Sequence, residues 1–127
     1  MRTPLKRDAP VVVLEVELHG PNGIHLVNMV LDTGATFTMI PWVVAEHLGY
    51  KPAVSKSRTT LTTASTTETV PLITLERMRV LGAEAKGVAV VIHDLPSKSR
   101  VDGLLGLSFL RRFNISLRFK AGFLEFE

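Results

Sequence analysis

The beginning of the chain alternates apolar and polar positions in a way that predicts a β-hairpin. Residues 11–19 are apolar except that Glu15 and Glu17 recur at every second position, which is the period of a half-buried strand. Residues 20–23 read Gly-Pro-Asn-Gly, and Asn-Gly favours the tight turns of hairpins. Residues 24–31 form an apolar return strand. We therefore expect two antiparallel strands joined by a short turn.

The middle of the chain predicts a short helix followed by two strand pairs of different character. Residues 37–40 continue as an apolar strand, and Pro41 suits the first turn of a helix over residues 41–48. Residues 55–69 are crowded with threonine and are polar on both faces, so the hairpin they predict cannot be buried on both sides. Residues 70–92 are more apolar and predict a second pair of strands.

The two ends of the chain differ in pattern. Residues 1–10 contain two prolines and mixed charges, and we expect a flexible lead-in there, followed by a single domain over residues 11–127. Residues 114–119 and 123–127 hold alternating apolar positions on either side of a turn and predict a C-terminal hairpin. An apolar terminal edge of this kind needs a partner strand.

Length and composition favour one compact unit without a membrane segment. A chain of 127 residues fits one domain with a core of its own. No stretch reaches the roughly 18 uncharged apolar residues of a membrane span. Glu15 and Glu17 interrupt the first apolar segment, so it does not read as a signal peptide, and we expect a cytoplasmic protein. The absence of cysteine excludes disulfides and thiol chemistry.

Charge and histidine content suggest neither a nucleic-acid nor a metal partner. The net charge of +3 is spread over mixed rather than blocked charges, and the basic stretch at residues 111–120 lacks an aromatic pattern for stacking bases. A nucleic-acid-binding β-domain, the disfavoured alternative, would bind with steep salt dependence. No glycine-rich phosphate loop is present, and we expect no metal and no cofactor. The four histidines lack metal-ligand spacing and are His19, His25, His47 and His93.

Asp32 is the chain's most informative residue, because it ends the apolar strand over residues 24–31. An unpaired charge is costly in a core, so a carboxylate at this position indicates a functional role. Thr33 offers a hydroxyl that can hydrogen-bond the turn, and Gly34 is free of Cβ constraints. The pattern is typical of an acid held at the base of a cleft by a tight loop. The plainer alternative is that Asp32 starts a surface turn.

This loop resembles the active-site loop of single-domain, retropepsin-like aspartic proteases. The matching residues are Asp32, Thr33, Gly34, Ala35 and Thr36. A second landmark of that family, an apolar-apolar-Gly segment before a short helix, is matched by Leu104, Leu105 and Gly106. The resemblance covers about residues 11–127. It implies an all-β fold, a closed acid-protease barrel with one or two short helices, assembled as a two-fold homodimer.

Two departures place the chain nearer the cellular and bacterial members than the retroviral ones. Retroviral members carry a paired Asp and Arg at the positions of Thr36 and Leu107. Both charges are absent here, so neither leaves a buried partner unpaired. The C-terminal hairpin is also extra, since a retroviral protease would stop near Phe119. We predict that the added strand widens the dimer sheet; the alternative is that it pairs only within its own subunit.

The resemblance also assigns roles to residues. Asp32 would be catalytic, Thr33 would brace the two loops of the dimer, and Gly34 would let the substrate backbone approach. Met39, Ile40 and Leu104 are candidates for lining the cleft, although core packing explains each equally well. The threonine-rich hairpin takes the place of the flap that closes over substrate, with a tip that lacks glycine. The residues predicted for this tip are Thr62, Thr63, Ala64, Ser65 and Thr66.

The function that follows is a homodimeric aspartic endopeptidase acting on polypeptides. Aspartic proteolysis needs two carboxylates that share one proton and activate a water, and this chain has one Asp-Thr-Gly. Asp32 of a second copy would therefore supply the other carboxylate. The alternative from another class is a catalytically silent module that keeps the fold and binds peptides or dimerises. Substitution of Asp32 by Asn distinguishes these two hypotheses.

Overall fold

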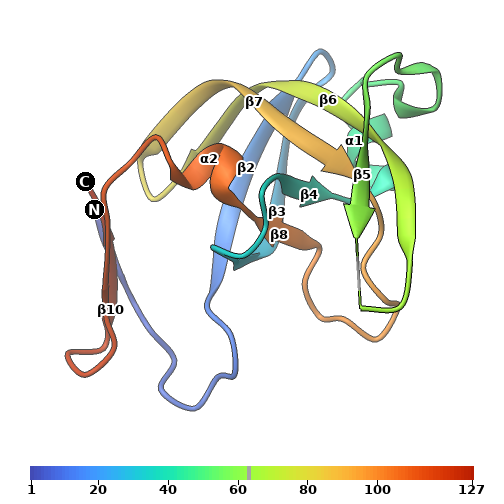
Figure 1. Ribbon diagram of the computed structural model, residues 1–127. Helices are drawn as coiled ribbons and strands as arrows, with labels where there is room; N and C mark the ends of the chain where they lie inside the picture. The colour runs from blue at the N-terminus through green and yellow to red at the C-terminus, as the bar shows by residue number, and fades with distance from the viewer. Residues whose placement is uncertain (63) are drawn as a thin grey trace.

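A computed structural model describes residues 1–62 and 64–127, and most of the strands within them form one closed barrel (Figure 1). Neighbouring barrel strands pair in the order β2-β3-β8-β4-β7-β6, and β6 closes the ring by pairing with β2. These strands are β2 (Val13–Gly20), β3 (Gly23–Leu31), β8 (Gly103–Leu105), β4 (Thr38–Ile40), β7 (Ala83–Ile92) and β6 (Thr67–Val80). The predicted all-β barrel is confirmed.

The hairpin of β2 and β3 follows directly from the alternating pattern of the sequence. Leu14, Val16 and Leu18 are buried in the barrel, while Glu15 between them is exposed. The turn requires glycine, since Gly23 has a φ of +126°, a region that side chains rarely allow. The hairpin thereby delivers the end of β3, and the loop after it, to the edge of the barrel.

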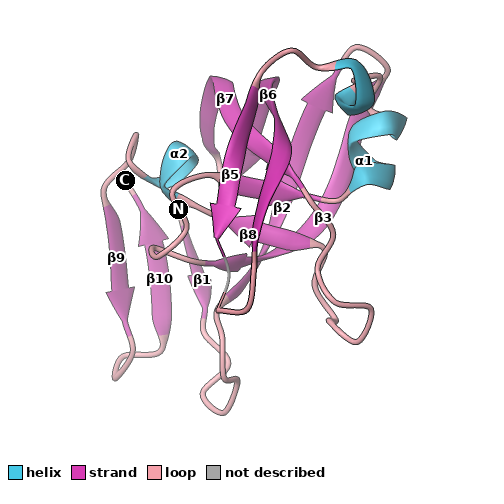
Figure 2. Cartoon of the chain, turned by 45° about the vertical axis from the view of Figure 1, so that its right-hand side comes forward, coloured by secondary structure: helices cyan, strands magenta, loops and turns pink. Residues whose placement is uncertain are grey.

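Two short α-helices and a 3₁₀ turn complete the described part of the barrel (Figure 2). They are α1 (Trp42–His47), α2 (Leu107–Leu110) and η1 (Pro52–Val54). Helix α1 starts after Pro41, as the sequence predicts, and α2 places Phe109 fully inside the core. Within the described residues, no helix has the length and apolar character needed to cross a membrane.

The barrel interior is filled by aliphatic side chains and one aromatic ring. The largest fully buried side chains include Phe109, Leu18, Met29, Ile40, Leu75 and Met78. A separate small cluster of Met39, Val70 and Val91 lies where β5 (Arg58–Thr62) pairs with β6 outside the ring. Strand β6 thus serves both regions, because it runs unbroken from the threonine-rich hairpin into the barrel wall.

The chain termini form a second sheet with the order β1-β10-β9. Its strands are β1 (Arg2–Pro4), β9 (Ile115–Arg118) and β10 (Phe123–Phe126). The C-terminal hairpin is as the sequence predicts, and within the region expected to be a flexible lead-in, residues 2–4 form strand β1. These residues are ordered by a distant partner: the N–H of Phe126 donates to the C=O of Met1 at 3.1 Å. No pattern within ten residues could reveal that pairing.

Candidate active site

Asp32 leads a tight loop directly after β3. Its N–H donates to the C=O of Leu105 at 3.0 Å, which ties the loop to β8. Its Oδ1 accepts the N–H of Gly34 at 2.9 Å, and its C=O accepts the N–H of Ala35 at 3.2 Å. The loop's own backbone therefore orients the carboxylate. The exposed residues of the loop are Thr33, Gly34 and Thr36.

The second landmark lies against this loop, and its glycine is required by close packing. A Cβ added to Gly106 would lie 2.6 Å from the backbone O of Phe37 and 2.8 Å from that of Ala35. Just beyond it, the N–H of Leu107 donates to the C=O of Ala35 at 2.8 Å. The N–H of Ser108 donates to the C=O of Thr36 at 3.0 Å. The start of α2 thus holds the far side of the Asp loop.

Thr38 and Ser108 contribute to this arrangement, and the sequence analysis missed both. Thr38 is 0 % exposed, and its Oγ1 accepts the N–H of Gly106 at 3.0 Å. The N–H of Thr38 donates in turn to Oγ of Ser108 at 2.9 Å. A hydroxyl within the apolar run at residues 37–40 was the available signal, because a buried hydroxyl needs a hydrogen-bond partner.

The Asp loop borders a groove of about 770 Å³ that extends to β5. Met39 and Leu104 line the groove, as proposed from the sequence, whereas Ile40 is buried in the barrel core. Alternate side chains of β4 point to opposite faces, which explains the difference. The groove wall is mixed, and its large apolar side chains are those of Phe37, Met39, Leu61, Val91, Leu95 and Leu104.

The threonine-rich hairpin also lines the groove that Asp32 borders. Thr60, Leu61 and Thr62 of β5 line the groove, and Thr62 pairs with Thr67 of β6. Of the predicted flap tip, Thr63 lies outside the described residues. The other residues of the connection are exposed and are Ala64, Ser65 and Thr66. The hairpin therefore meets the groove through β5 itself.

The remaining aspartates near the site have structural partners. Oδ1 of Asp94 accepts the N–H of Trp42 at 3.0 Å and so caps α1 from outside the helix. Oδ2 of Asp102 accepts the N–H of Asn28 at 2.9 Å, which anchors the segment leading into β8. Asp94 also lines the groove together with His93. No local pattern in the sequence identifies these two rim residues.

His93 connects the groove rim to the threonine-rich hairpin, close to the turn between β5 and β6. Its Nε2 lies 3.5 Å from Oε2 of Glu68 on β6, and both side chains are partly exposed. A partly exposed polar contact of this kind contributes at most about 1 kcal/mol. The contact therefore adds little to the stability of the hairpin.

Comparisons with known proteins agree with this geometry. The family described as aspartyl protease matches residues 14–109, a span that contains both the Asp loop and the second landmark. A crystal structure of a retropepsin-like aspartic protease from Rickettsia conorii superposes with a TM-score of 0.69 and 21 % identity. The match covers 99 % of this chain and 88 % of that one, which shows a shared fold. No curated protein matches the sequence. On the family match, the chain belongs to the aspartyl protease family.

Proposed function

We propose that this chain is an aspartic endopeptidase that works as a homodimer. The observation that carries the proposal is the position of Asp32: its carboxylate borders the groove and is oriented by the loop's own N–H group at 2.9 Å. Catalytic groups need this kind of fixed orientation. The family match over residues 14–109 supports the same reaction class.

The second carboxylate comes from a second copy of the chain. Asp94 and Asp102 each accept a backbone N–H that anchors another segment, so both already have a structural role. Asp8 lies in the exposed N-terminal region. A two-fold axis beside Asp32 supplies an identical carboxylate in an identical loop.

The overall shape suits such a partner. Figure 1 shows the flap hairpin and the C-terminal hairpin extending toward the same side of the barrel, at opposite ends of the view. The Asp loop, residues 32–36, lies between them. A second copy placed there would meet the Asp loop in its middle and complete the groove.

The reaction follows from the paired carboxylates. Two carboxylates a hydrogen bond apart cannot both ionise easily, so one keeps its proton. The ionised Asp32 takes a proton from a water, whose oxygen attacks the peptide carbonyl carbon. The protonated Asp32 of the other copy donates a hydrogen bond to the carbonyl oxygen and stabilises the developing charge. A proton passes to the nitrogen as the C–N bond breaks, which leaves a carboxylic acid and an amine.

The groove suits an extended polypeptide. Strand β5 forms one wall, and an extended peptide can add its backbone hydrogen bonds beside a strand of this kind. The apolar wall residues, Met39, Leu61 and Leu104 among them, favour apolar side chains of the substrate next to the cleaved bond.

Cleavage of a diverse peptide library from mildly acid to neutral pH tests the proposal. Wild type should cut, and Asp32→Asn should lose at least about a hundredfold in rate, as expected when a general acid–base group is removed. Asp8→Asn is the matched control and should cut like wild type. If the wild-type dimer makes no cuts, the proposal is wrong and the protein is a silent peptide-binding or dimerisation module.

A further inference from the structure

The groove beside Asp32 is acidic, although the protein as a whole is basic. Two carboxylates line the groove, those of Asp32 and Asp94, and no lysine or arginine is found among the described residues that line it. Its other ionisable lining residue, His93, lies 3.5 Å from Oε2 of Glu68. The whole chain, in contrast, has a net charge of +3. A cleft lined by one sign of charge attracts ligand groups of the opposite sign.

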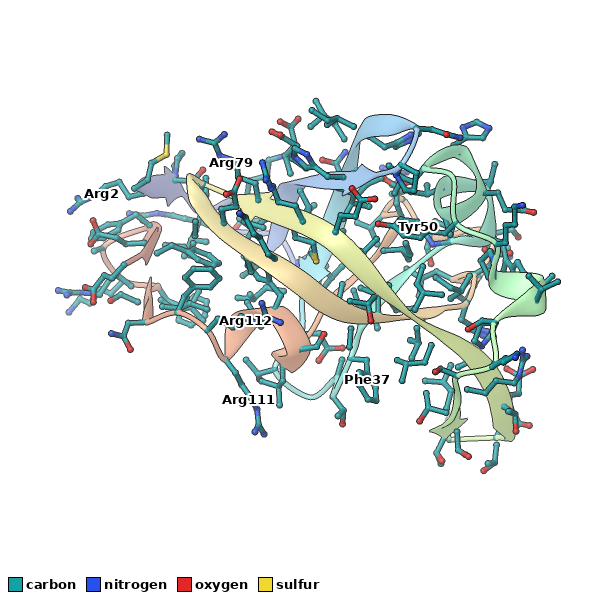
Figure 3. The ribbon with its side chains drawn as sticks, turned by 90° about the horizontal axis from the view of Figure 1, so that it is seen from above. Arg2, Phe37, Tyr50, Arg79, Arg111 and Arg112 are labelled. Carbon is teal, nitrogen blue, oxygen red and sulfur yellow. The ribbon has the colours of Figure 1, made fainter. Side chains whose placement is uncertain are left out.

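The basic side chains of the protein lie elsewhere. In Figure 3, the labelled Arg2 and Arg79 lie well away from the labelled Phe37, which lines the groove. Arg112 is engaged by the barrel wall, because its guanidinium donates to backbone C=O groups of β7. Within the described part of the chain, no ion pair includes Asp94. The protein itself therefore supplies no cation that pairs with this carboxylate.

The Asp94 side chain is held in place with one oxygen still available. Its Oδ1 accepts the N–H of Trp42 at 3.0 Å. The N–H of His93, the preceding residue, donates to the C=O of Ile40 at 3.1 Å and fixes the backbone there. Among the described residues, Oδ2 of Asp94 has no hydrogen-bond partner, and the residue is exposed. A side chain that is already ordered loses little conformational entropy when a ligand binds to it.

Strand β4 separates the two carboxylates of the groove. The N–H of Asp32 donates to the C=O of Leu105, which is the neighbour of the β8 residue paired with β4. Asp94 bonds to Trp42, just beyond the other end of β4. The extended segment from Thr38 to Trp42 spans roughly 13 Å at the usual rise of a strand. Asp94 is thus placed to contact a substrate side chain and not the bond that is cleaved.

We propose that Asp94 is a specificity-determining residue that selects a lysine or arginine side chain of the substrate. The basic group donates a charge-assisted hydrogen bond to Oδ2 of Asp94. The inference rests on the proposed function, and the two-fold axis gives each side of the cleaved bond an Asp94 of its own. The substrate class is then an extended polypeptide with apolar residues at the cleaved bond and a basic residue on one or both sides of it.

A scan of one cleaved peptide tests this selection. Lys, Gln and Glu, which are similar in length, are placed in turn at each position, and kcat/KM is measured for every peptide. At a position on each side of the cleaved bond, wild type should prefer Lys over Gln roughly fivefold, equivalent to about 1 kcal/mol for an exposed ion pair. Glu should be the poorest of the three. The preference should shrink as salt is added, because salt screens exposed charges.

The variant Asp94→Asn removes the charge but keeps an oxygen that can accept the N–H of Trp42. Its ratio of kcat/KM for the Lys and Gln peptides should fall to about one. Asp94→Lys should reverse the preference in favour of Glu. Asp8→Asn is the matched control, because it removes the same charge from an exposed residue that does not line the groove, and it should keep the wild-type ratio.

The outcomes separate the two proposals. A wild type that cleaves peptides without preferring Lys, or an Asp94→Asn variant that keeps the preference, overturns the role of Asp94 and leaves the protease proposal standing. A wild type that cuts no peptide overturns the protease proposal instead. Fluorescence anisotropy of a labelled Leu-Leu peptide flanked by Lys or by Gln then decides on Asp94. Tighter binding of the Lys peptide that is lost in Asp94→Asn supports its role, and equal binding of the two peptides overturns it.

Discussion

The Asp loop and the threonine-rich hairpin of β5 and β6 border the same groove but are held in opposite ways. The loop is tied by backbone hydrogen bonds of 2.8–3.0 Å to a segment about seventy residues away, with Thr38 buried behind it. The flap strand β5 pairs with β6 and presents exposed threonines, and Leu61 packs on the small cluster below. The Asp32 loop is fixed by several long-range contacts, whereas the threonine-rich hairpin is held by pairing between strands that are neighbours in sequence. Substitutions in the two regions should therefore have different effects on stability and on cleavage kinetics.

Among the variants that test this contrast, Gly106→Ala should have the largest effect on stability and activity. The added methyl meets backbone atoms at 2.6–2.8 Å, so the Asp loop must shift. We expect a loss of about 1–3 kcal/mol in the free energy of unfolding, typical of overpacking, together with loss of cleavage. Urea unfolding and peptide assays measure both. Gly87→Ala is the control, since its methyl meets only Thr74 at 3.9 Å; it should lose stability from its φ of +62° but keep activity.

Thr38→Val should have the next largest effect. It removes the hydroxyl that accepts the Gly106 N–H and leaves that buried donor unpaired, at about 1–3 kcal/mol. The maximal cleavage rate should fall with the stability, because the Asp loop loosens. Thr60→Val on the flap strand removes an exposed hydroxyl and should change stability by less than about 0.5 kcal/mol. Equal losses in the two variants would contradict the contrast between the regions.

Leu61→Ala tests the flap side. Leu61 lines the groove and packs on the cluster of Met39, Val70 and Val91. Its truncation should raise KM roughly tenfold, equivalent to about 1.4 kcal/mol of binding, while the maximal rate changes little. Steady-state kinetics with one cleaved peptide measure this, and Val54→Ala serves as the unaffected control. A fall in maximal rate with unchanged KM would place Leu61 in catalysis instead.

Tyr50→Phe should have the smallest effect and should leave activity intact. The Tyr50 hydroxyl donates to the C=O of His19 at 3.0 Å and accepts the N–H of Glu76 at 2.8 Å, far from the groove. Its loss should cost about 1 kcal/mol. Burial raises the pKa of Tyr50 above its usual value of 10, so its contribution is present below pH 10 and is lost as pH rises through the raised pKa. Urea midpoints at neutral and alkaline pH measure it, and a variant as stable as wild type at neutral pH would contradict it.

How far the sequence predicts this molecule depends on the range of each interaction. Alternation and turn residues predicted the β2–β3 hairpin, and Asp32 was found because a carboxylate ends an apolar strand. Local pattern could not reveal that Thr38 bonds Gly106, 68 positions away, or that β1 pairs with β10. Asp94 likewise caps a helix 52 positions earlier. These contacts are properties of the closed barrel, not of any segment.

The parallel pairing of β3 with β8 also affects how the protein is made. The bond from Asp32 to Leu105, and those from Leu107 and Ser108 back to the Asp loop, cannot form until residues 105–108 have left the ribosome. Long-range parallel pairing is slow to form in folding. A nascent chain in which residues 105–108 are still inside the ribosome therefore lacks these contacts to the Asp loop. The topology therefore delays formation of the candidate active site until β3 and β8 have paired.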